Sequence, residues 1–255
     1  MRFWSVPLIV LILLWTMWTM PRAIALSSTS LDEFSRSSAI QPATGDLEYP
    51  DWMAGTWEVT STLVAASAPL APEIVSPGFE SNRRTLNQPF KFQVRFRTKY
   101  AAPRTIPVPS LTKLPVVADR AFNGLKIAEA YLGEDAVLSV KGDPDTPNRQ
   151  ITRLASGQLI STITRRGSQS PSADEFTATE ICQQIFRSRS QIYLNEVATT
   201  TTYRHTGDRI AADQTTAIYL SPQDPNYFRA AGRPVAHYRY RLELVPVDQL
   251  RMTNH

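Results

Sequence analysis

The stretch FKFQVRFRTKY, Phe90 to Tyr100, alternates apolar and polar side chains across eleven residues. The apolar positions are Phe90, Phe92, Val94, Phe96 and Tyr100, and the polar positions are Lys91, Gln93, Arg95, Arg97 and Lys99. A period of two residues places these sets on opposite faces of a β-strand, and it cannot produce the apolar stripe of an amphipathic helix. This stretch therefore predicts a strand with one dry face and one wet face.

The same two-residue period recurs along the rest of the chain. Eight further runs show it, at residues 56–64, 136–141, 149–154, 159–165, 175–187, 192–205, 215–220 and 237–245. LPVVADRAF, residues 114–122, is a candidate tenth strand. Only NGLKIAEAYLG, residues 123–133, has helix-like spacing, although it fits a pair of strands equally well. Pro-rich connectors separate the runs, so the pattern favours an antiparallel sheet.

An open sheet with this many strands would expose two unpaired edges, and closure into a barrel removes them. Strands of this length also suit the tilted wall of a barrel better than a compact immunoglobulin-like sandwich, which is the alternative. We therefore predict an all-β fold, an antiparallel up-and-down β-barrel of about eight to ten strands.

The N-terminal segment MRFWSVPLIVLILLWTMWTMPRAIALSS has the layout of an export signal. Arg2 precedes a charge-free apolar stretch, and the small-residue site Ala23-Ile24-Ala25 follows it. We expect residues 1–25 to be a cleaved signal peptide, 26–48 a flexible Ser/Thr-rich tether, 49–248 the barrel domain and 249–255 a C-terminal tail. The expected compartment is the periplasm or thylakoid lumen. The alternative is an uncleaved membrane anchor, since residues 3–20 carry no charge.

Charge and cysteine content limit the classes of partner and of stabilisation. Loss of Arg2 and Arg22 with the signal would lower the formal net charge from +4 to +2, and the remaining charges are scattered. We therefore expect no nucleic-acid partner, and membrane contact only through the signal segment or a partner complex. Cys182 is the only cysteine, so no intramolecular disulfide can form, and its strand suggests a buried small hydrophobe.

Gly55-Thr56-Trp57, at the start of the first long strand, resembles the Gly-x-Trp signature of lipocalins and their calycin relatives. In those families the tryptophan plugs one end of the barrel beneath an arginine of the last strand. The resemblance implies that role for Trp57, with Arg239 or Arg241 of HYRYRLEL above it. The simpler alternative makes Trp57 an ordinary core residue.

A longer pattern resembles a family of uncharacterised exported proteins of cyanobacteria and plastids with lipocalin-like barrels. It consists of YPDWMAGTWEV, VVADRAFNG, DPDTPNR and DPNYFRAAGRPVAHYRY, between Tyr49 and about Val247. This resemblance implies a compartment and a lipocalin-like fold, but no activity.

The usual catalytic signatures of serine hydrolases, zincins, P-loop enzymes and thioredoxin-like proteins are missing from the sequence, so we predict no catalytic residue. Three histidines, His205, His237 and His255, are too few for a multi-histidine metal centre. His237 resembles the single haem ligand of nitrobindin-type barrels. However, the glycines that follow Gly-x-Trp in those proteins are missing, and His237 alternates in phase with Arg239. We expect a surface histidine and no cofactor.

Polar residues beside turns are the candidates for ligand contact. Arg120 and Asn123, and the group Asp143, Asn148 and Arg149, could present guanidinium forks to a carboxylate or phosphate. The alternative makes them turn formers or ion-pair partners.

Two glutamates lie in the middle of predicted strands. Glu180 shares the phase of Phe176, Cys182 and Phe186, and Glu196 that of Leu194. An inward-facing glutamate would indicate a polar cavity, because a buried carboxylate must be paired or protonated.

The function expected from these features is a non-catalytic barrel that carries a small hydrophobic or amphipathic ligand, a lipid or a pigment. Inward aromatic side chains would bury its body, and one or two arginines would orient its head. The first alternative is an interaction module for a membrane or photosynthetic complex, docking through loop aromatics such as Tyr227 and Phe228. The second is a calycin-type enzyme.

Overall fold

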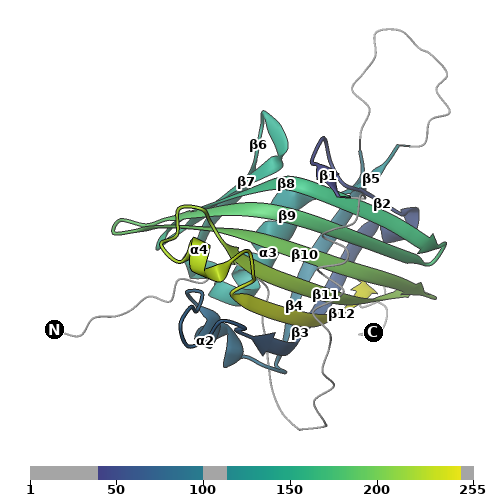
Figure 1. Ribbon diagram of the computed structural model, residues 1–255. Coiled ribbons are helices and arrows are strands. Elements are labelled where there is room, and N and C mark those ends of the chain that lie inside the picture. Colours follow the sequence, from purple (N-terminus) through teal and green to yellow (C-terminus); the bar gives the residue numbers. More distant parts are fainter. Residues whose placement is uncertain (1–39, 100–113, 248–255) are drawn as a thin grey trace.

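The computed structural model describes residues 40–99 and 114–247, which form one antiparallel sheet with short helices (Figure 1). The strands are β1 Gln41–Pro42, β2 Glu48–Tyr49, β3 Gly55–Ser67, β4 Pro89–Thr98, β5 Val116–Ala118, β6 Val137–Asp143, β7 Thr146–Leu154, β8 Gly157–Ser172, β9 Glu175–Arg187, β10 Ile192–Thr206, β11 Arg209–Leu220 and β12 Ala236–Pro246. The helices are η1 Asp51–Met53, α2 Phe79–Arg83, α3 Arg120–Leu132, η2 Glu134–Ala136 and α4 Tyr227–Ala230. The nine strands expected from sequence are β3, β4 and β6 to β12, and the candidate tenth is β5.

The strand order is β2-β5-β4-β3-β12-β11-β10-β9-β8-β7-β6, with β1 paired to β8. From β6 to β12 the chain runs as a meander, and β12 then pairs with β3, so the two ends of the domain meet inside the sheet. The sheet curls into a half-barrel (Figure 1). The all-β antiparallel barrel expected from sequence is confirmed, and two stacked sheets of a sandwich are not found among the described residues.

Among the described residues, the two edges of the curled sheet do not pair with each other along their length. A helix instead fills the gap between β4 on one side and β6 on the other. α3 packs against β4 and β6, and Tyr131 places its ring centroid 4.4 Å from that of Phe90. Asp119 caps the helix by accepting a hydrogen bond from the Phe122 amide, and Gly133, at φ 84°, ends it. The helix-like interpretation of residues 123–133 is therefore correct. None of the described helices combines the length and apolar character needed to span a bilayer.

A short N-terminal strap, residues 41–49, crosses the same gap. β1 pairs with β8 through Gln41 and Arg166, whereas β2 pairs with β5 through Tyr49 and Val116. The sequence analysis assigns residues 26–48 to a tether, but backbone pairing already begins at Gln41. Residues 26–39 and the expected signal peptide lie outside the described residues.

The strap leads into a plug at one end of the barrel. Gly55, at φ 127°, takes a conformation that favours glycine and turns the chain into β3. Trp57 is 6% exposed, and its indole Nε1 donates a 2.9 Å hydrogen bond to the carbonyl oxygen of Met53, which is fully buried. The indole thus lies in the core at this end, a position that fits both the Gly-x-Trp resemblance and the alternative of an ordinary core residue.

The arginine partner implied by that resemblance is not there. On β12 the buried side chains are Tyr238, Tyr240, Leu242 and Leu244, so Arg239 and Arg241 point to the outer face. Arg239 lies 3.5 Å from Asp213 of the neighbouring strand, and Arg241 is exposed. Neither can cover Trp57, because the two-residue period of β12 puts them on the opposite side of the sheet.

Candidate functional site

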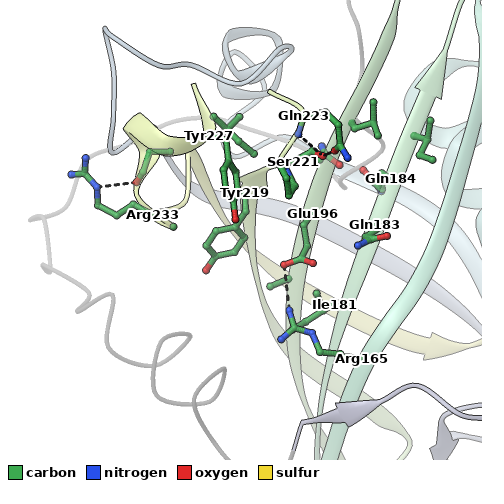
Figure 2. Close-up of a pocket in the computed structure, with 18 residues that line it drawn as sticks. Arg165, Ile181, Gln183, Gln184, Glu196, Tyr219, Ser221, Gln223, Tyr227 and Arg233 are labelled. Carbon is green, nitrogen blue, oxygen red and sulfur yellow. Dashed lines mark hydrogen bonds and ion pairs between the residues drawn. The ribbon is translucent and has the colours of Figure 1, made fainter. Parts of the chain in front are cut away.

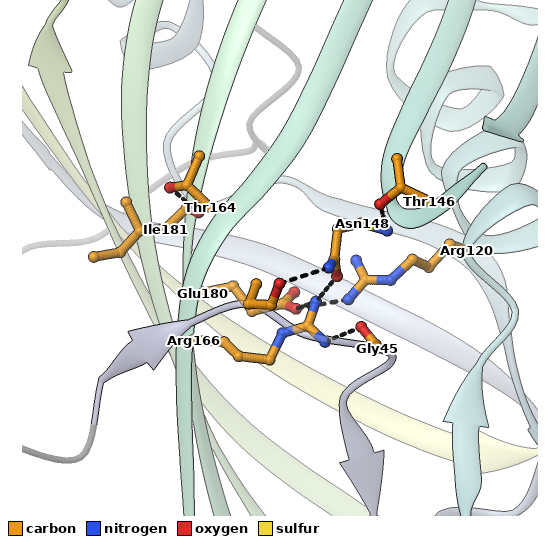
Figure 3. Close-up of polar contacts among 9 residues, drawn as sticks. Gly45, Arg120, Thr146, Asn148, Thr164, Arg166, Glu180 and Ile181 are labelled. Atoms are coloured by element: carbon orange, nitrogen blue, oxygen red, sulfur yellow. Dashed lines mark hydrogen bonds and ion pairs between the residues drawn. The ribbon is translucent and has the colours of Figure 1, made fainter.

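The concave face of the sheet, which we call the lumen face, carries a buried polar cluster (Figure 3). β9 presents to this face Phe176, Ala178, Glu180, Cys182, Gln184 and Phe186. Phe176 and Ala178 belong to the hydrophobic core, which fixes the inward phase of the strand and therefore of Glu180. The condition set by the sequence analysis for a polar interior, an inward-facing glutamate, is met by Glu180.

Two arginines share one oxygen of this glutamate. Arg120 of α3 places Nη2 2.6 Å from Glu180 Oε1, and Arg166 of β8 places Nη2 3.2 Å from the same atom. Arg166 also donates to the carbonyl oxygen of Gly45 at 2.8 Å and to Asn148 Oδ1. Asn148 Nδ2 in turn donates to the carbonyl oxygen of Ala43 at 3.0 Å. The cluster thus joins α3, β7, β8, β9 and the strap.

The cluster carries more positive than negative charge. Its two guanidiniums both contact Glu180, and the only further negative charge that acts on them among the described residues is that of Asp46, which is itself paired with Lys99 at 3.0 Å. The Nε atoms of Arg120 and Arg166 are buried without a hydrogen-bond partner in the described chain. The side chain of Arg166 is only 10% exposed, whereas those of Arg120 and Glu180 are 23% and 22% exposed. The cations of the cluster thus outnumber the carboxylate that they contact.

The electrostatics of the two arginines differ. Burial lowers the pKa of Arg120, but the charge of Glu180 and its hydrogen bond outweigh that effect and raise the pKa above its ordinary value. For Arg166 burial dominates, and together with the charge of Arg120 it lowers the pKa despite the attraction of Glu180. Arg166 is thus the less fully compensated cation of the pair.

Aromatic side chains form a dry floor beneath the cluster. The ring centroid of Tyr49 lies 4.8 Å from that of Phe96 and 5.5 Å from that of Phe176, and Phe176 stacks on Tyr203 at 6.3 Å. Burial raises the pKa of Tyr49 well above its ordinary value, with smaller contributions from Tyr203 and Glu180. This floor separates the cluster from the plug around Trp57.

Cys182, on the opposite side of the cluster from this floor, borders internal space. Its side chain faces the lumen and is partly accessible to solvent, although protein atoms surround it on nearly all sides. Burial, followed by the charge of Glu180, raises the pKa of the thiol to about 12.

A second polar group follows further along the same strands. Asn195 of β10 pairs directly with Gln184 of β9, and Tyr193 lies two residues along on the same face. Asn195 is 3% exposed, and neither atom of its amide is hydrogen-bonded within the described chain. The same holds for Gln184 Oε1 and the Tyr193 hydroxyl. Burial and then the charge of Asp224 raise the Tyr193 pKa to about 12, and a hydrogen-bonding contact with the Asn195 side chain, outside regular hydrogen-bond geometry, opposes them.

The outer face of the sheet has a groove beside the β11–β12 loop (Figure 2). Its volume is about 570 Å³, and its lining includes Ile181, Leu194, Ala198, Tyr219 and Tyr227. Gln184 and Asn195, on the two strands between this groove and the lumen, also border it. Arg165 and Glu196, 3.4 Å apart, form an ion pair in its wall. Glu196 therefore points outward, unlike Glu180, and so contributes nothing to the lumen.

The remaining candidates from sequence have structural positions. Asn123 exchanges hydrogen bonds with the backbone of Arg95, at 2.7 and 3.2 Å, and so fastens α3 to β4. Arg149 lies 3.5 Å from Asp143 at the β6–β7 turn. His237 pairs with Ala217 on the outer face of β12. Within the described ranges, no group of three or more His, Cys, Asp or Glu residues could hold a metal ion.

The structure thus brings together Arg120, Glu180 and Asn148 among the residues singled out from sequence, and adds Arg166, Gln184, Tyr193 and Asn195. Arg166 escaped sequence reasoning because a register shift between Ile163 and Arg165 reverses the phase of β8. Gln184 could have been found, since it continues the inward phase of Glu180 and Cys182.

Comparison with known proteins gives one family. The model of a domain of unknown function, DUF6816, matches residues 41–248. This match begins at β1 and includes every strand of the sheet. Neither the curated proteins nor the solved structures yielded a match.

Proposed function

We propose, for a chain that belongs to the DUF6816 family of domains of unknown function, that the barrel binds a small amphipathic anion in its lumen. Arg120 and Arg166 hold the carboxylate or phosphate head, and the apolar body lies along the lumen face of β9 and β10. The ligand class is a lipid or pigment acid, carried without chemical change by a lipocalin-like barrel.

The observation that carries this proposal is the excess charge of the buried cluster. Glu180 is the one carboxylate that contacts both guanidiniums, since Asp46 is paired with Lys99, and both Nε atoms are buried without a partner in the described chain. An arginine fork matches carboxylate and phosphate geometry, and such charge-assisted hydrogen bonds are strong where water is excluded. An anionic head at this place would complete both the charge balance and the hydrogen bonding.

The lumen face beyond the cluster suits the hydrocarbon part of such a ligand. Cys182 and Val197 face each other across β9 and β10, and Ile163 pairs with Cys182 from β8. These side chains carry no strong hydrogen-bonding group, so the ligand's hydrocarbon part would gain from leaving water.

Calorimetric titration of the full-length chain with decanoate and with the uncharged decanol tests the proposal. Arg166→Gln should weaken decanoate binding about tenfold or more and leave decanol binding unchanged. Arg239→Gln, which removes an arginine from the outer face, is the matched control and should bind both as the unaltered protein does. Equal decanoate affinity in all three proteins, or no binding at all, would refute the proposal.

A folding defect in Arg166→Gln would not leave the test open. Arg166→Lys keeps the charge but loses the planar fork, so it should fold and bind decanoate with intermediate affinity. The unaltered protein and the three variants share the same N-terminal segment, so any binding of ligand by that segment is equal in all four.

We also propose export to the periplasm or thylakoid lumen, on the basis of the N-terminal sequence. Mass spectrometry of the protein recovered from its native compartment should find Leu26 as the first residue. A chain that retains residues 1–25 in the membrane would favour the anchor instead.

One surface feature favours a second candidate function, docking to a partner in an assembly. Phe228 of α4 is 88% exposed, and Ile192 of the β9–β10 hairpin is 62% exposed. Phe228 also packs against Tyr227, with ring centroids 5.4 Å apart, and aromatic side chains are enriched in protein–protein interfaces. Phe228→Ser should release the protein from such an assembly without changing its thermal unfolding temperature, and unchanged sedimentation of the variant with its native membranes would exclude this candidate.

A further inference from the structure

We propose that the ligand carries a second, uncharged hydrogen-bonding group, a hydroxyl or carbonyl, at the end opposite its anionic head. Asn195, Gln184 and Tyr193 form the site that receives it. This inference rests on the proposed function, because it identifies the second end of the molecule whose first end the arginines hold.

The primary observation is an amide buried without partners. Asn195 is 97% removed from solvent, yet neither Nδ2 nor Oδ1 is hydrogen-bonded within the described chain. Folding transfers this amide out of water at a considerable free-energy cost, and native proteins rarely leave such a group unsatisfied. A ligand that supplies the missing hydrogen bonds would offset this free-energy cost in the complex.

The neighbours of Asn195 repeat the pattern. Gln184 is its direct cross-strand partner, and Tyr193 projects from the same face of β10. Gln184 Oε1 has no hydrogen-bond partner in the described chain, and the Tyr193 hydroxyl makes a contact with the Asn195 side chain that falls short of regular hydrogen-bond geometry. Three adjacent side chains with unmet hydrogen bonds form a site, whereas one alone could be an isolated defect.

The chemistry of these side chains selects a neutral group. The Asn195 amide offers donors and an acceptor, Gln184 Oε1 accepts, and the Tyr193 hydroxyl can do either. A hydroxyl or carbonyl can be satisfied by this set. The charge that acts on Tyr193 comes from Asp224 and is negative, so it would repel a second carboxylate.

The two polar sites are separated by an apolar interval on one strand face. Glu180 and Gln184 are four residues apart on β9, which corresponds to roughly 13 Å of strand. The lumen-facing residue between them is Cys182, opposite Val197. With C–C bonds of about 1.5 Å, an extended chain of roughly ten carbon atoms covers this span.

The test compares decanoate with 10-hydroxydecanoate on the full-length chain by calorimetric titration. The unaltered protein should bind the hydroxy acid about tenfold more tightly, since the hydroxyl satisfies groups that decanoate leaves unpaired. Asn195→Leu should abolish this preference and retain decanoate binding. Gln214→Leu alters another buried amide of the lumen face, one that already pairs with Thr201, and should keep the preference.

Chain length provides an independent readout. The shorter 6-hydroxyhexanoate cannot reach from the arginines to Asn195, so it should gain nothing over hexanoate. A gain of equal size for the short and long hydroxy acids would show that the hydroxyl binds elsewhere and would overturn the inference.

The outcomes separate this inference from the proposed function. If decanoate itself fails to bind, the proposed function fails. If decanoate binds but the hydroxyl adds no affinity, then only the second site is refuted, and its side chains hold water or nothing. Should Asn195→Leu fail to fold, Gln184→Met removes the adjacent acceptor and is expected to reduce the preference in the same way.

Discussion

Arg120 donates from Nη2 to Glu180 Oε1 across 2.6 Å, and this contact joins α3 to the far wall of the barrel (Figure 3). The helix completes the curl of the sheet without sharing strand hydrogen bonds. An ion pair and aromatic packing therefore hold the helix against the sheet, as backbone hydrogen bonds hold neighbouring strands together. The same contact places a cation at the lumen, so one pair of side chains contributes both to the attachment of α3 and to the candidate site.

Glu180→Gln should lower the free energy of unfolding and make that free energy depend on bound anions. The change leaves two buried guanidiniums without a counter-charge, and we expect a loss of about 3 kcal/mol in the free energy of unfolding, measured by urea denaturation. Decanoate should restore part of this loss by binding the native state.

The matched control for this prediction is Glu196→Gln. Its ion pair with Arg165 lies on the outer face, with side chains 32% and 49% exposed. A change below about 1 kcal/mol is expected there. Similar losses for both variants would contradict a special role of the lumen cluster.

Trp57→Ala should cost about 3–5 kcal/mol of unfolding free energy, because it empties the plug of the barrel and leaves the Met53 carbonyl without its donor. Trp52→Ala is the comparison, since Trp52 stacks on His205 at 5.1 Å and remains partly exposed. It should lose about 1–2 kcal/mol. Chemical denaturation of both variants checks the difference, and a smaller loss for Trp57→Ala would deny that the indole seals the barrel.

Asn195→Leu should raise the free energy of unfolding by about 1 kcal/mol in the absence of ligand, because it removes a buried amide that has no partner. Gln214→Leu should act in the opposite direction, since Thr201 then loses its hydrogen-bond acceptor. The pair of denaturation curves distinguishes a residue kept for binding from one kept for stability. Destabilisation by Asn195→Leu would show that its amide is satisfied in solution.

Cys182 should react slowly with alkylating reagents despite its partial accessibility. Its pKa of about 12 leaves roughly one thiolate in ten thousand at pH 8, which is about three orders of magnitude below an ordinary cysteine. Iodoacetamide labelling followed by mass spectrometry should show rapid modification only after unfolding in urea. Rapid labelling of the native protein would indicate a thiol with an ordinary or lowered pKa.

Stability should fall at alkaline pH through buried tyrosines. Burial raises the pKa of Tyr193, Tyr203 and Tyr238 to about 12, against an unfolded value near 10. The folded state therefore retains these protons longer than the unfolded state. The stabilisation is complete below pH 10 and is lost as the pH rises to about 12.

Urea midpoints measured between pH 9 and 12, together with tyrosinate absorbance, check this window. Tyr203→Phe removes one of the three groups and should make the decline less steep. A stability that stays constant up to pH 12 would contradict the burial of these hydroxyls.

Much of the fold could be predicted because a strand with one buried face requires apolar and polar side chains to alternate along a short stretch of sequence. The alternation of Phe90 to Phe96 survives in β4, where Phe92, Val94 and Phe96 are buried. The site could be predicted only in part. Arg120 and Glu180 stood out as polar residues in unusual places, but Asn195 did not, since an asparagine within a strand has no signature until its partners are known.

The sequence by itself determined where the long strands lie, that they pair antiparallel, and that Trp57 stands at the start of the first long strand. Tertiary structure decided which face of each strand points inward, and that α3 completes the curl. Alternation is symmetric, because a period of two defines two faces without saying which one meets the core. By simple alternation Arg165 would follow Ile163 into the lumen, but the bulge between them reverses the phase and sends Arg166 inward instead. The register of strand pairing resolves that symmetry, and the bulged pairing of β8 with β9 brings Arg166 opposite Glu180.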